Sequence, residues 1–401
     1  MKKQVKKPAK KFTLSKKREL ELKSRELIDG NSACAFAVKL CHVESIPAFP
    51  ITPQTELMEK LALWISTGEL DSYLNVMESE HSVLSAAVGS EMTGVRTFVS
   101  SGSQGLMLMH EILPITSGTR MPIVMICGSR ALSAPIALWP DHNDFLSCRD
   151  FGWLMMAAEI NQELLDFICI AYRVAESKKV LLPALIEMDG FILSETREPV
   201  EIPRQEIVDR FLPELKLETM LDVEKPMTLG TPVLEDYQNF KEQMQAAQNN
   251  ALKEFEKAFK DWKSLTGRKY DFVEKVWMEN AEIAVVMMGA NATIAKAAVR
   301  KMRGEGKKVG LVKLRVLRPW PEKSIMQALK KCKKIAVVDQ NISLGKSGIL
   351  YNEICETLKD EGKILSNYIA GLGGKHLSIQ DFEQILTDLE KSKKSEKKWL
   401  S

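Results

Sequence analysis

Hydrophobic residues in this chain gather in short continuous runs, which alternate with longer stretches where apolar positions recur every three or four residues. Runs such as PIVMIC and VLLPALIEM are typical of strands buried on both faces of a parallel sheet, and the longer stretches are typical of amphipathic helices. Asn31 is the expected cap of the first helix, and a loop-rich segment is expected at 128–150. Up to residue 188 the pattern predicts strands at 46–51, 73–77, 96–100, 122–127 and 180–188, and helices at 32–43, 54–67, 81–94, 104–116 and 161–177.

The same alternation returns after residue 280. Alternation at this spacing is typical of βαβ units with right-handed crossovers. The fold class is therefore α/β, with a parallel sheet in each of two units. In the second unit we predict strands at 283–289, 308–314, 335–339 and 366–370, and helices at 291–304, 322–331, 347–360 and 379–391.

The remaining segments divide the chain into four parts. We predict a basic N-terminal arm at 1–28, an α/β domain at 29–197, a connector at 198–275 and a second α/β domain at 276–395. The arm is expected to be flexible, with a helix from Leu14 onward. The connector has prolines in its first part and a polar helical stretch at 235–264. The Lys/Ser-rich tail after Glu390 is expected to be frayed.

Composition limits the classes of function. The 401 residues are 45% hydrophobic and 27% charged, with a formal net charge of +3, as in ordinary globular proteins. Much of the lysine lies at the two ends, so we expect no nucleic-acid-binding face. No apolar run reaches the about 18 residues of a membrane span, so we expect no membrane contact. No apolar segment follows the basic N-terminus as in a secretory signal, and a cytoplasmic protein is expected.

The seven cysteines are scattered, and no C-x-x-C motif occurs. A disulfide framework is therefore not expected. Four closely spaced thiolates are missing, so this chain is not expected to hold an iron–sulfur cluster itself.

The chemistry-bearing residues follow predicted strands. Glu80 comes directly after the strand at 73–77, Thr52 lies in the segment FPITP, and Arg130 lies in GSRALSAP. In open α/β sheets, ligands bind outside the carboxyl ends of the strands. Glu80 can also be explained as an acidic residue that is favoured by the dipole of the following helix, and Thr52 as a helix cap beside Pro53.

Three blocks of the first half, in order, carry a resemblance: FPITPQTELMEKL, VMESEHSVLSAAVGSEMTGVRTFVSSGSQGLMLMHE and SRALSAPIALWPDHNDFLSCRDFGW. They resemble the α subunits of 2-oxoacid:ferredoxin oxidoreductases, above all pyruvate:ferredoxin oxidoreductase (pyruvate synthase). The first domain then corresponds to the pyrimidine-binding domain of thiamine enzymes. The segments VGLVKLRVLRPWP, KIAVVDQNIS and YIAGLGGKHLS resemble the transketolase C-terminal-like domain that follows it.

The resemblance implies an enzyme that converts pyruvate, coenzyme A and oxidised ferredoxin into acetyl-CoA, CO2 and reduced ferredoxin, and also the reverse. It implies thiamine diphosphate as a cofactor shared with a partner subunit, coenzyme A as co-substrate, and partners of the β, γ and δ types. No G-D-G motif for Mg²⁺ and diphosphate is present, and Met188-Asp189-Gly190 is the nearest segment. The Mg²⁺ and the [4Fe-4S] clusters are therefore expected on partner subunits. The alternatives are another 2-oxo acid (a branched 2-oxo acid, 2-oxoglutarate or oxalate) and a non-catalytic scaffold.

The resemblance also assigns roles to residues. Glu80 matches the carboxyl group that hydrogen-bonds N1′ of the aminopyrimidine and favours its 4′-imino form. Thr52 and Arg130 match positions that contact the 2-oxo acid, whose carboxylate a guanidinium can bind through two hydrogen bonds. Ser101 and Gln104 are candidates for packing beside the cofactor ring.

Other polar residues are expected near the site without a direct role. Phe49 stands where family members commonly have Tyr before the PITP segment, which leaves the preferred 2-oxo acid open. Asp141, His142 and Asp144 form a polar cluster in a loop near the site or a subunit contact. His142 is either an acid/base group or a structural histidine. No metal site is expected in this chain.

Overall fold

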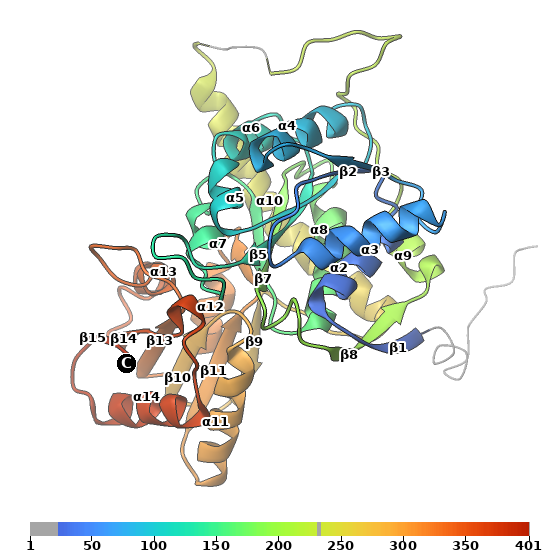
Figure 1. Cartoon of the computed structure of the whole chain (residues 1–401). Coiled ribbons are helices and arrows are strands. Elements are labelled where there is room, and N and C mark those ends of the chain that lie inside the picture. Colours follow the sequence, from blue (N-terminus) through green and yellow to red (C-terminus); the bar gives the residue numbers. More distant parts are fainter. Residues whose placement is uncertain (1–22, 231–233, 401) are drawn as a thin grey trace, which may run out of the picture.

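The computed structural model describes residues 23–230 and 234–400. Its first unit is built on a five-stranded sheet of order β12-β6-β7-β5-β4, in which β4 to β7 are parallel (Figure 1). A parallel pair, β2 with β3, extends this sheet through a bridge between Ser45 and Thr97. The strands are β2 Ser45–Ala48, β3 Tyr73–Val76, β4 Phe98–Ser101, β5 Val124–Ser129, β6 Leu154–Ala157, β7 Ala184–Asp189 and β12 Val316–Arg318.

Helices cover both faces of this sheet, so its central strands are fully buried, as continuous apolar runs require. They are α2 Gly30–Leu40, α3 Thr55–Ser66, α4 Glu80–Glu91, α5 Ser103–Leu108, α6 Ile112–Gly118, α7 Asn143–Ser147 and α8 Asn161–Ala175.

The second unit contains a six-stranded sheet of order β15-β14-β13-β10-β11-β9, parallel except for β9. Figure 1 shows it beside the first unit, at the orange and red end of the colour bar. Its strands are β9 Val273–Val276, β10 Ile283–Met287, β11 Val309–Leu314, β13 Lys334–Asp339, β14 Ile364–Ile369 and β15 Lys397–Trp399; its helices are α11 Ala292–Gly304, α12 Glu322–Leu329, α13 Ile349–Thr357 and α14 Ile379–Lys391, with a short 3-10 helix η1 Leu372–Gly374.

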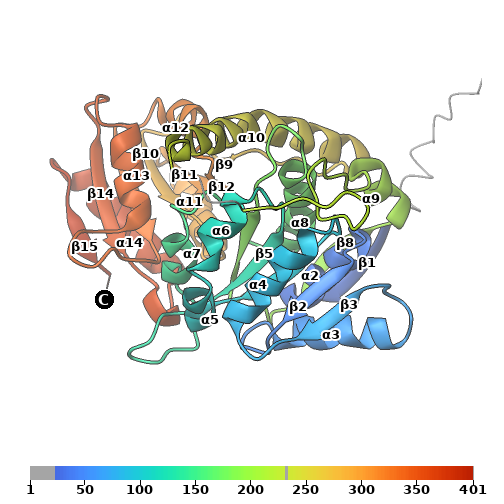
Figure 2. The same ribbon diagram turned by 90° about the horizontal axis from the view of Figure 1, so that it is seen from above.

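Four further elements complete the two units. The chain returns from the second unit as β12, Val316–Arg318, which pairs antiparallel with β6 of the first sheet. The segment before β9 contains β8 Glu198–Pro203, α9 Gln205–Phe211 and the long helix α10 Tyr237–Thr266. Figure 2 shows α10 lying along the molecule beside elements of both units. Searched across the described residues, no helix is both long and apolar enough to cross a membrane.

Several sequence predictions for local structure are wrong. The cap of α2 is Asp29, whose side chain accepts a hydrogen bond from the Ser32 backbone (2.7 Å), whereas Asn31 is buried inside the helix. The predicted helix 104–116 is two helices, α5 and α6. The break lies at 109–111, and Pro114, in the first turn of α6, lacks the N–H that would bond to the His110 carbonyl in a continuous helix.

Strands were also missed or misplaced. Strand β6 follows the loop-rich segment and was not predicted. Strand β7 begins at Ala184, because Pro183 before it has no N–H to give to the ladder. The tail is not frayed: β15 pairs with β14, so this segment is an edge strand. Residues 23–28 of the predicted arm form β1, which pairs antiparallel with β8. The helix expected from Leu14 lies at least partly outside the described residues.

A buried ion network joins the two units. Lys313 of β11 is 1% exposed and pairs with Glu159 (2.5 Å), Glu163 (2.8 Å) and Glu274 (3.0 Å). Glu159 and Glu163 come from the first unit and Glu274 from β9 of the second. Arg315 also pairs with Glu163 and Glu274. Burial would raise the pKa of Glu274, but the surrounding cations lower it to about 2.

Replacement of Lys313 is therefore expected to destabilise the chain. In Lys313→Met the Glu159 and Glu163 carboxylates stay buried without the ammonium group, and we expect the free energy of unfolding to fall by about 3 kcal/mol. Lys308→Met is the control, because its ion pair with Glu282 is exposed and should contribute under about 1 kcal/mol. Equal shifts of the denaturant midpoint in the two variants would contradict a structural role for the network.

Candidate active site

The carboxyl ends of the parallel strands meet at one edge of the first sheet. The turn after β2 carries Thr52, the turn after β3 carries Glu80, and the turn after β5 carries Arg130. The turn after β4 carries Ser101 through Gly105. Parallel strands bring the residues that follow them to the same edge, so these four turns form one candidate site.

Glu80 is the first residue of α4 and is 7% exposed. Ser79 caps this helix, its side chain accepting a hydrogen bond from the Ser82 backbone. The Glu80 carboxyl group packs on the backbone of Gly105, where an added Cβ would lie only 2.5 Å from Oε1 and 2.7 Å from Ser101 Oγ. The Ser101 hydroxyl is buried and has no hydrogen-bond partner among the described residues. A buried carboxyl group and an unpartnered hydroxyl therefore lie side by side.

Thr52 and Arg130 are brought together as expected from their positions. The Arg130 guanidinium donates from Nη1 to the Thr52 carbonyl oxygen (3.1 Å), and its Nε is buried without a partner among the described residues. Thr52 itself is exposed. The Arg130 guanidinium therefore has unused N–H donors, and it lies beside the exposed Thr52 side chain.

Gln54 was missed by sequence reasoning. It is 2% exposed, and both polar atoms of its side-chain amide lack a hydrogen-bond partner in the described part of the chain. Its oxygen lies against Gly128, where an added Cβ would be 2.7 Å away. Asn31 was assigned only to a helix cap, but its amide donates to the Pro53 carbonyl (2.9 Å) and so holds the turn of Thr52 in place. Neither contact has a local sequence signal.

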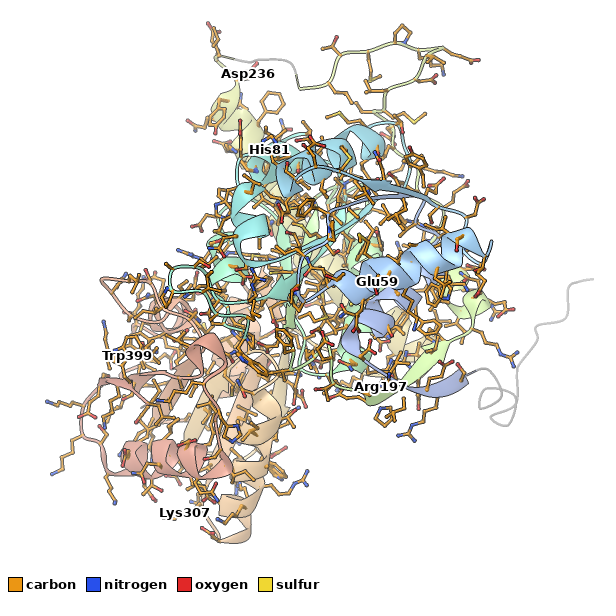
Figure 3. The ribbon with its side chains drawn as sticks, in the orientation of Figure 1. Glu59, His81, Arg197, Asp236, Lys307 and Trp399 are labelled. Atoms are coloured by element: carbon orange, nitrogen blue, oxygen red, sulfur yellow. The ribbon has the colours of Figure 1, made fainter. Side chains whose placement is uncertain are left out.

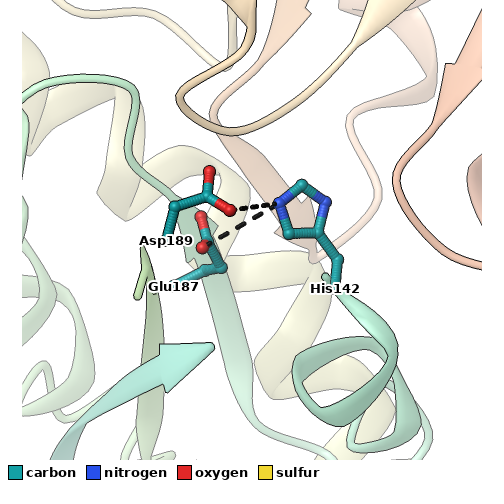
Figure 4. A group of neighbouring side chains, drawn as sticks. All are labelled: His142, Glu187 and Asp189. Carbon is teal, nitrogen blue, oxygen red and sulfur yellow. Dashed lines mark hydrogen bonds and ion pairs between the residues drawn. The ribbon is translucent and has the colours of Figure 1, made fainter. Parts of the chain in front are cut away.

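The polar cluster of the loop is buried and lies between the units. His142 is fully buried, and its Nε2 is 3.1 Å from Asp189 Oδ1 and 4.0 Å from Glu187 Oε1 (Figure 4). Asp189 also accepts a hydrogen bond from the Ala290 backbone of the second unit (2.7 Å). Burial would lower the pKa of His142, but the charge and hydrogen bond of Asp189, together with the charges of Asp141 and Asp144, outweigh it, so the pKa is raised.

Glu187 is the unusual member of this group. Neither of its carboxyl oxygens has a hydrogen-bond partner of good geometry in the described chain. Burial raises its pKa well above the usual range, and the charges of Asp189 and Asp144 raise it further; the nearby Ser129 hydroxyl offsets only part of this. These surroundings favour the neutral form of the Glu187 carboxyl group. His142 is thus enclosed between the carboxyl end of β7 and the second unit, which are surroundings typical of a structural histidine.

The remaining predicted residues lie around the edge of the site. Gln104 is exposed and donates to the Ser133 carbonyl (3.3 Å). Phe49 is partly buried and packs against the core of the first unit. Asp141 is buried, and its Oδ1 accepts a hydrogen bond from the Asn143 backbone N–H (3.0 Å).

The neighbours of Glu80 in sequence do not share its surroundings. Glu78 is exposed, and its bond from Ser82 lowers the pKa of its carboxyl group. His81 pairs instead with the exposed Glu111, and Figure 3 shows it on the first unit, far from Lys307 and Trp399 of the second. Only Glu80 of this acidic turn is buried against Gly105.

Comparison with known families decides what this arrangement is. A family model described as pyruvate flavodoxin/ferredoxin oxidoreductase, thiamine diP-binding, matches residues 36–260. The chain belongs to this family. A second model, pyruvate:ferredoxin oxidoreductase core domain II, matches residues 281–382.

Relatives cover nearly the whole chain. Pyruvate synthase subunit PorA of Methanothermobacter thermautotrophicus is 42% identical over 92% of this chain and 96% of its own length. The subunit of the same name from Pyrococcus abyssi is 44% identical over 90% of this chain and 93% of its own. Ketoisovalerate oxidoreductase subunit VorA of Pyrococcus abyssi is 39% identical over 92% of this chain and 94% of its own length. The predicted resemblance and enzyme class, an α subunit of a 2-oxoacid:ferredoxin oxidoreductase, are confirmed.

Two solved structures share the fold. A 2-oxoglutarate:ferredoxin oxidoreductase from Magnetococcus marinus has a TM-score of 0.69 at 17% identity, covering 91% of this chain and 65% of that longer chain. A split-gene transketolase has a TM-score of 0.54 at 12% identity, covering 91% of this chain and 98% of that one. The predicted fold class, with its transketolase-like second domain, is confirmed.

Proposed function

We propose that this chain is the catalytic α subunit of a pyruvate:ferredoxin oxidoreductase, and that Glu80, Thr52 and Arg130 act in a site shared with a partner subunit. The observation that carries the proposal is the buried Glu80 carboxyl group, packed on Gly105 beside the unpartnered Ser101 hydroxyl. The thiamine-binding family model spans all three residues.

The residues present fit a thiamine ring. Gly105 leaves the Glu80 carboxyl uncovered by any side chain at that position, and Ser101 and Gln54 present buried polar atoms without partners among the described residues. Such atoms cost free energy unless a ligand or water satisfies them. An aminopyrimidine offers a ring nitrogen and an amino group that can take up these hydrogen bonds.

Glu80 would hold the pyrimidine through a hydrogen bond to N1′ and thereby favour the imino tautomer. Thiamine diphosphate, when bound, supplies the nucleophilic carbon that attacks the 2-oxo group and the electron sink for loss of CO2. Glu80 is partly desolvated, which strengthens its hydrogen bond relative to one in water. The Gly105 backbone packs against this carboxyl group and limits its movement.

Arg130 would bind the substrate carboxylate. Its Nη1 already donates to the Thr52 carbonyl, so the guanidinium is oriented while its other N–H groups remain available. The Thr52 hydroxyl is exposed at the same place and can donate to the 2-oxo group. These residues bind and orient the substrate next to the pyrimidine held by Glu80.

The proposal assigns the other parts to partners. The diphosphate with its Mg²⁺ and the [4Fe-4S] clusters would be held by β, γ and δ-type subunits in the cytoplasm, coenzyme A would be the acyl acceptor, and ferredoxin would take the electrons. Pyruvate is favoured because the relatives named pyruvate synthase are 42–44% identical, against 39–40% for those named ketoisovalerate oxidoreductase.

Purification from its native source with identification of the co-purifying subunits tests this function. We expect the complex to reduce ferredoxin or a viologen dye with pyruvate and coenzyme A, at a kcat/KM at least about tenfold above that for 2-oxoisovalerate or 2-oxoglutarate, because one substrate methylene contributes about 1–3 kcal/mol. A complex that prefers 2-oxoisovalerate would move the proposal to the branched acids. A complex that oxidises none of them would favour a scaffold.

A further inference from the structure

One carboxylate holds two of the four turns of the site. Asp144 is fully buried, and its Oδ2 accepts hydrogen bonds from the Ser103 backbone (2.7 Å) and the Arg130 backbone (3.1 Å). Its Oδ1 accepts from the Phe145 backbone (2.7 Å). Ser103 belongs to the turn after β4 and Arg130 to the turn after β5, so Asp144 fixes the spacing between them.

The Asp144 carboxylate is bound mainly by backbone N–H groups. Among the residues that the structure describes, no Lys, Arg or His side chain forms an ion pair with it, and its partners are three N–H groups and the Cys127 thiol (3.6 Å). Hydrogen bonds to a carboxylate are roughly twice as strong as neutral ones. This arrangement orders the two turns instead of neutralising a cation.

The segment that carries Asp144 is itself anchored from the second unit. The His142 backbone donates to the Gln340 carbonyl (2.8 Å), and the Asn143 side chain accepts from the Ile342 backbone (2.9 Å). The position of Asp144 relative to the first sheet is thus set by the contact between the units. A loop without these contacts to the second unit would leave Asp144 freer to move relative to the first sheet.

We propose that Asp144 is a positioning residue that holds the Arg130 backbone, and through it the guanidinium, at the place where the substrate carboxylate binds. This rests on the proposed function, in which Arg130 binds the 2-oxo acid. Asp144 does not touch the substrate. It limits the freedom of the residue that does, so its loss weakens substrate binding more than the chemical step.

The ionised form of Asp144 is the one that accepts these bonds. Burial raises its pKa to about 6, although the three backbone hydrogen bonds lower it. Because protonation replaces an acceptor by a donor, KM for the 2-oxo acid should rise as pH falls through about 6. The titratable groups that face Asp144 are Asp141 and His142 of its own segment, Cys127 of β5, Glu187 of β7 and Cys148 directly after α7.

The test uses Asp144→Ala and Asp144→Asn in the assembled complex. We expect Asp144→Ala to raise KM for pyruvate about 30-fold and to change kcat less than about threefold, because a displaced binding group acts mainly on substrate binding. In Asp144→Asn the rise of KM below pH 6 should disappear. In the Arg130→Ala background, Asp144→Ala should add less than about twofold to KM, since the two residues act as one unit.

Asp339 provides a matched control in the second unit. It is also fully buried, accepts hydrogen bonds from the Leu350 and Tyr351 backbones, and has a pKa that burial raises to about 6. Asp339→Asn should affect stability without changing KM or its pH profile. Amide hydrogen exchange measured by mass spectrometry should speed up at 101–105 and 128–132 in Asp144→Ala only.

The outcomes separate this inference from the proposed function. An unchanged KM in Arg130→Ala alone would overturn the proposed role of Arg130, and the positioning role with it, whatever the exchange data show. A raised KM in Arg130→Ala with an unchanged KM in both Asp144 variants would overturn only the positioning role. A similar change of KM in Asp339→Asn, or a full additive effect in the double variant, would also contradict it.

Discussion

Glu80→Gln should lower kcat/KM for pyruvate oxidation by about 10⁴-fold, near the upper limit for one group in proton transfer. Glutamine keeps the size and the buried position of the side chain but cannot carry or share the proton at the pyrimidine ring. The same variant should lose exchange of the C2 proton of bound thiamine diphosphate, followed by NMR in deuterated buffer. Assembly with the partner subunits should be unaffected, because Glu80 packs on Gly105 of its own chain.

Glu78→Gln is the matched control for this experiment. Glu78 lies two residues away in the same acidic turn, but it is exposed and bonded only to Ser82. We expect activity within about twofold of the unchanged complex, in line with surface substitutions. Near-normal pyruvate oxidation by Glu80→Gln, or equal losses in the two variants, would contradict the assignment of Glu80.

Arg130→Ala should lower kcat/KM for pyruvate by about 10³-fold, or about 4 kcal/mol, with most of the loss in KM. The guanidinium is the only cationic side chain among the assigned site residues, and its removal leaves the substrate carboxylate without a charged partner. Arg130→Lys should recover only part of the loss, because an ammonium group cannot make two parallel hydrogen bonds to a carboxylate. Steady-state kinetics with pyruvate in the reconstituted complex measures both variants.

Arg197→Ala is the control for Arg130→Ala, because it also removes one positive charge from the first unit. Arg197 is exposed, and Figure 3 shows it at the surface of the first unit. Its removal should leave KM unchanged, since long-range effects of exposed charges are screened. If KM rises equally in both variants, the effect is one of overall charge, and the substrate carboxylate binds elsewhere.

The parts of the fold that were predictable are those with a local signal. The buried strands β5, β7, β10 and β13 are continuous apolar runs, and the residues that follow such strands meet at one edge. This topology explains why Thr52, Glu80 and Arg130 are found in neighbouring turns, whereas their roles are assigned by the resemblance of the surrounding segments to the family.

The parts that failed depend on contacts between distant segments. Strand β6 is only four residues, Leu154–Ala157, with two methionines and no alternation, and it is a strand because β7 and β12 lie on either side of it. Strand β15 is a charged edge strand, identified only by its pairing with β14. Gln54 and the bonds of Asp144 depend on turns that the fold brings together. No spacing along the chain predicts such contacts.

A density map of the assembled complex with thiamine diphosphate bound is the most direct test of the central claim. The account predicts the Glu80 carboxyl group within hydrogen-bond distance of pyrimidine N1′, with the diphosphate and its metal ion held by a different subunit. A cofactor enclosed entirely by this chain, or a ring nitrogen far from Glu80, would contradict it.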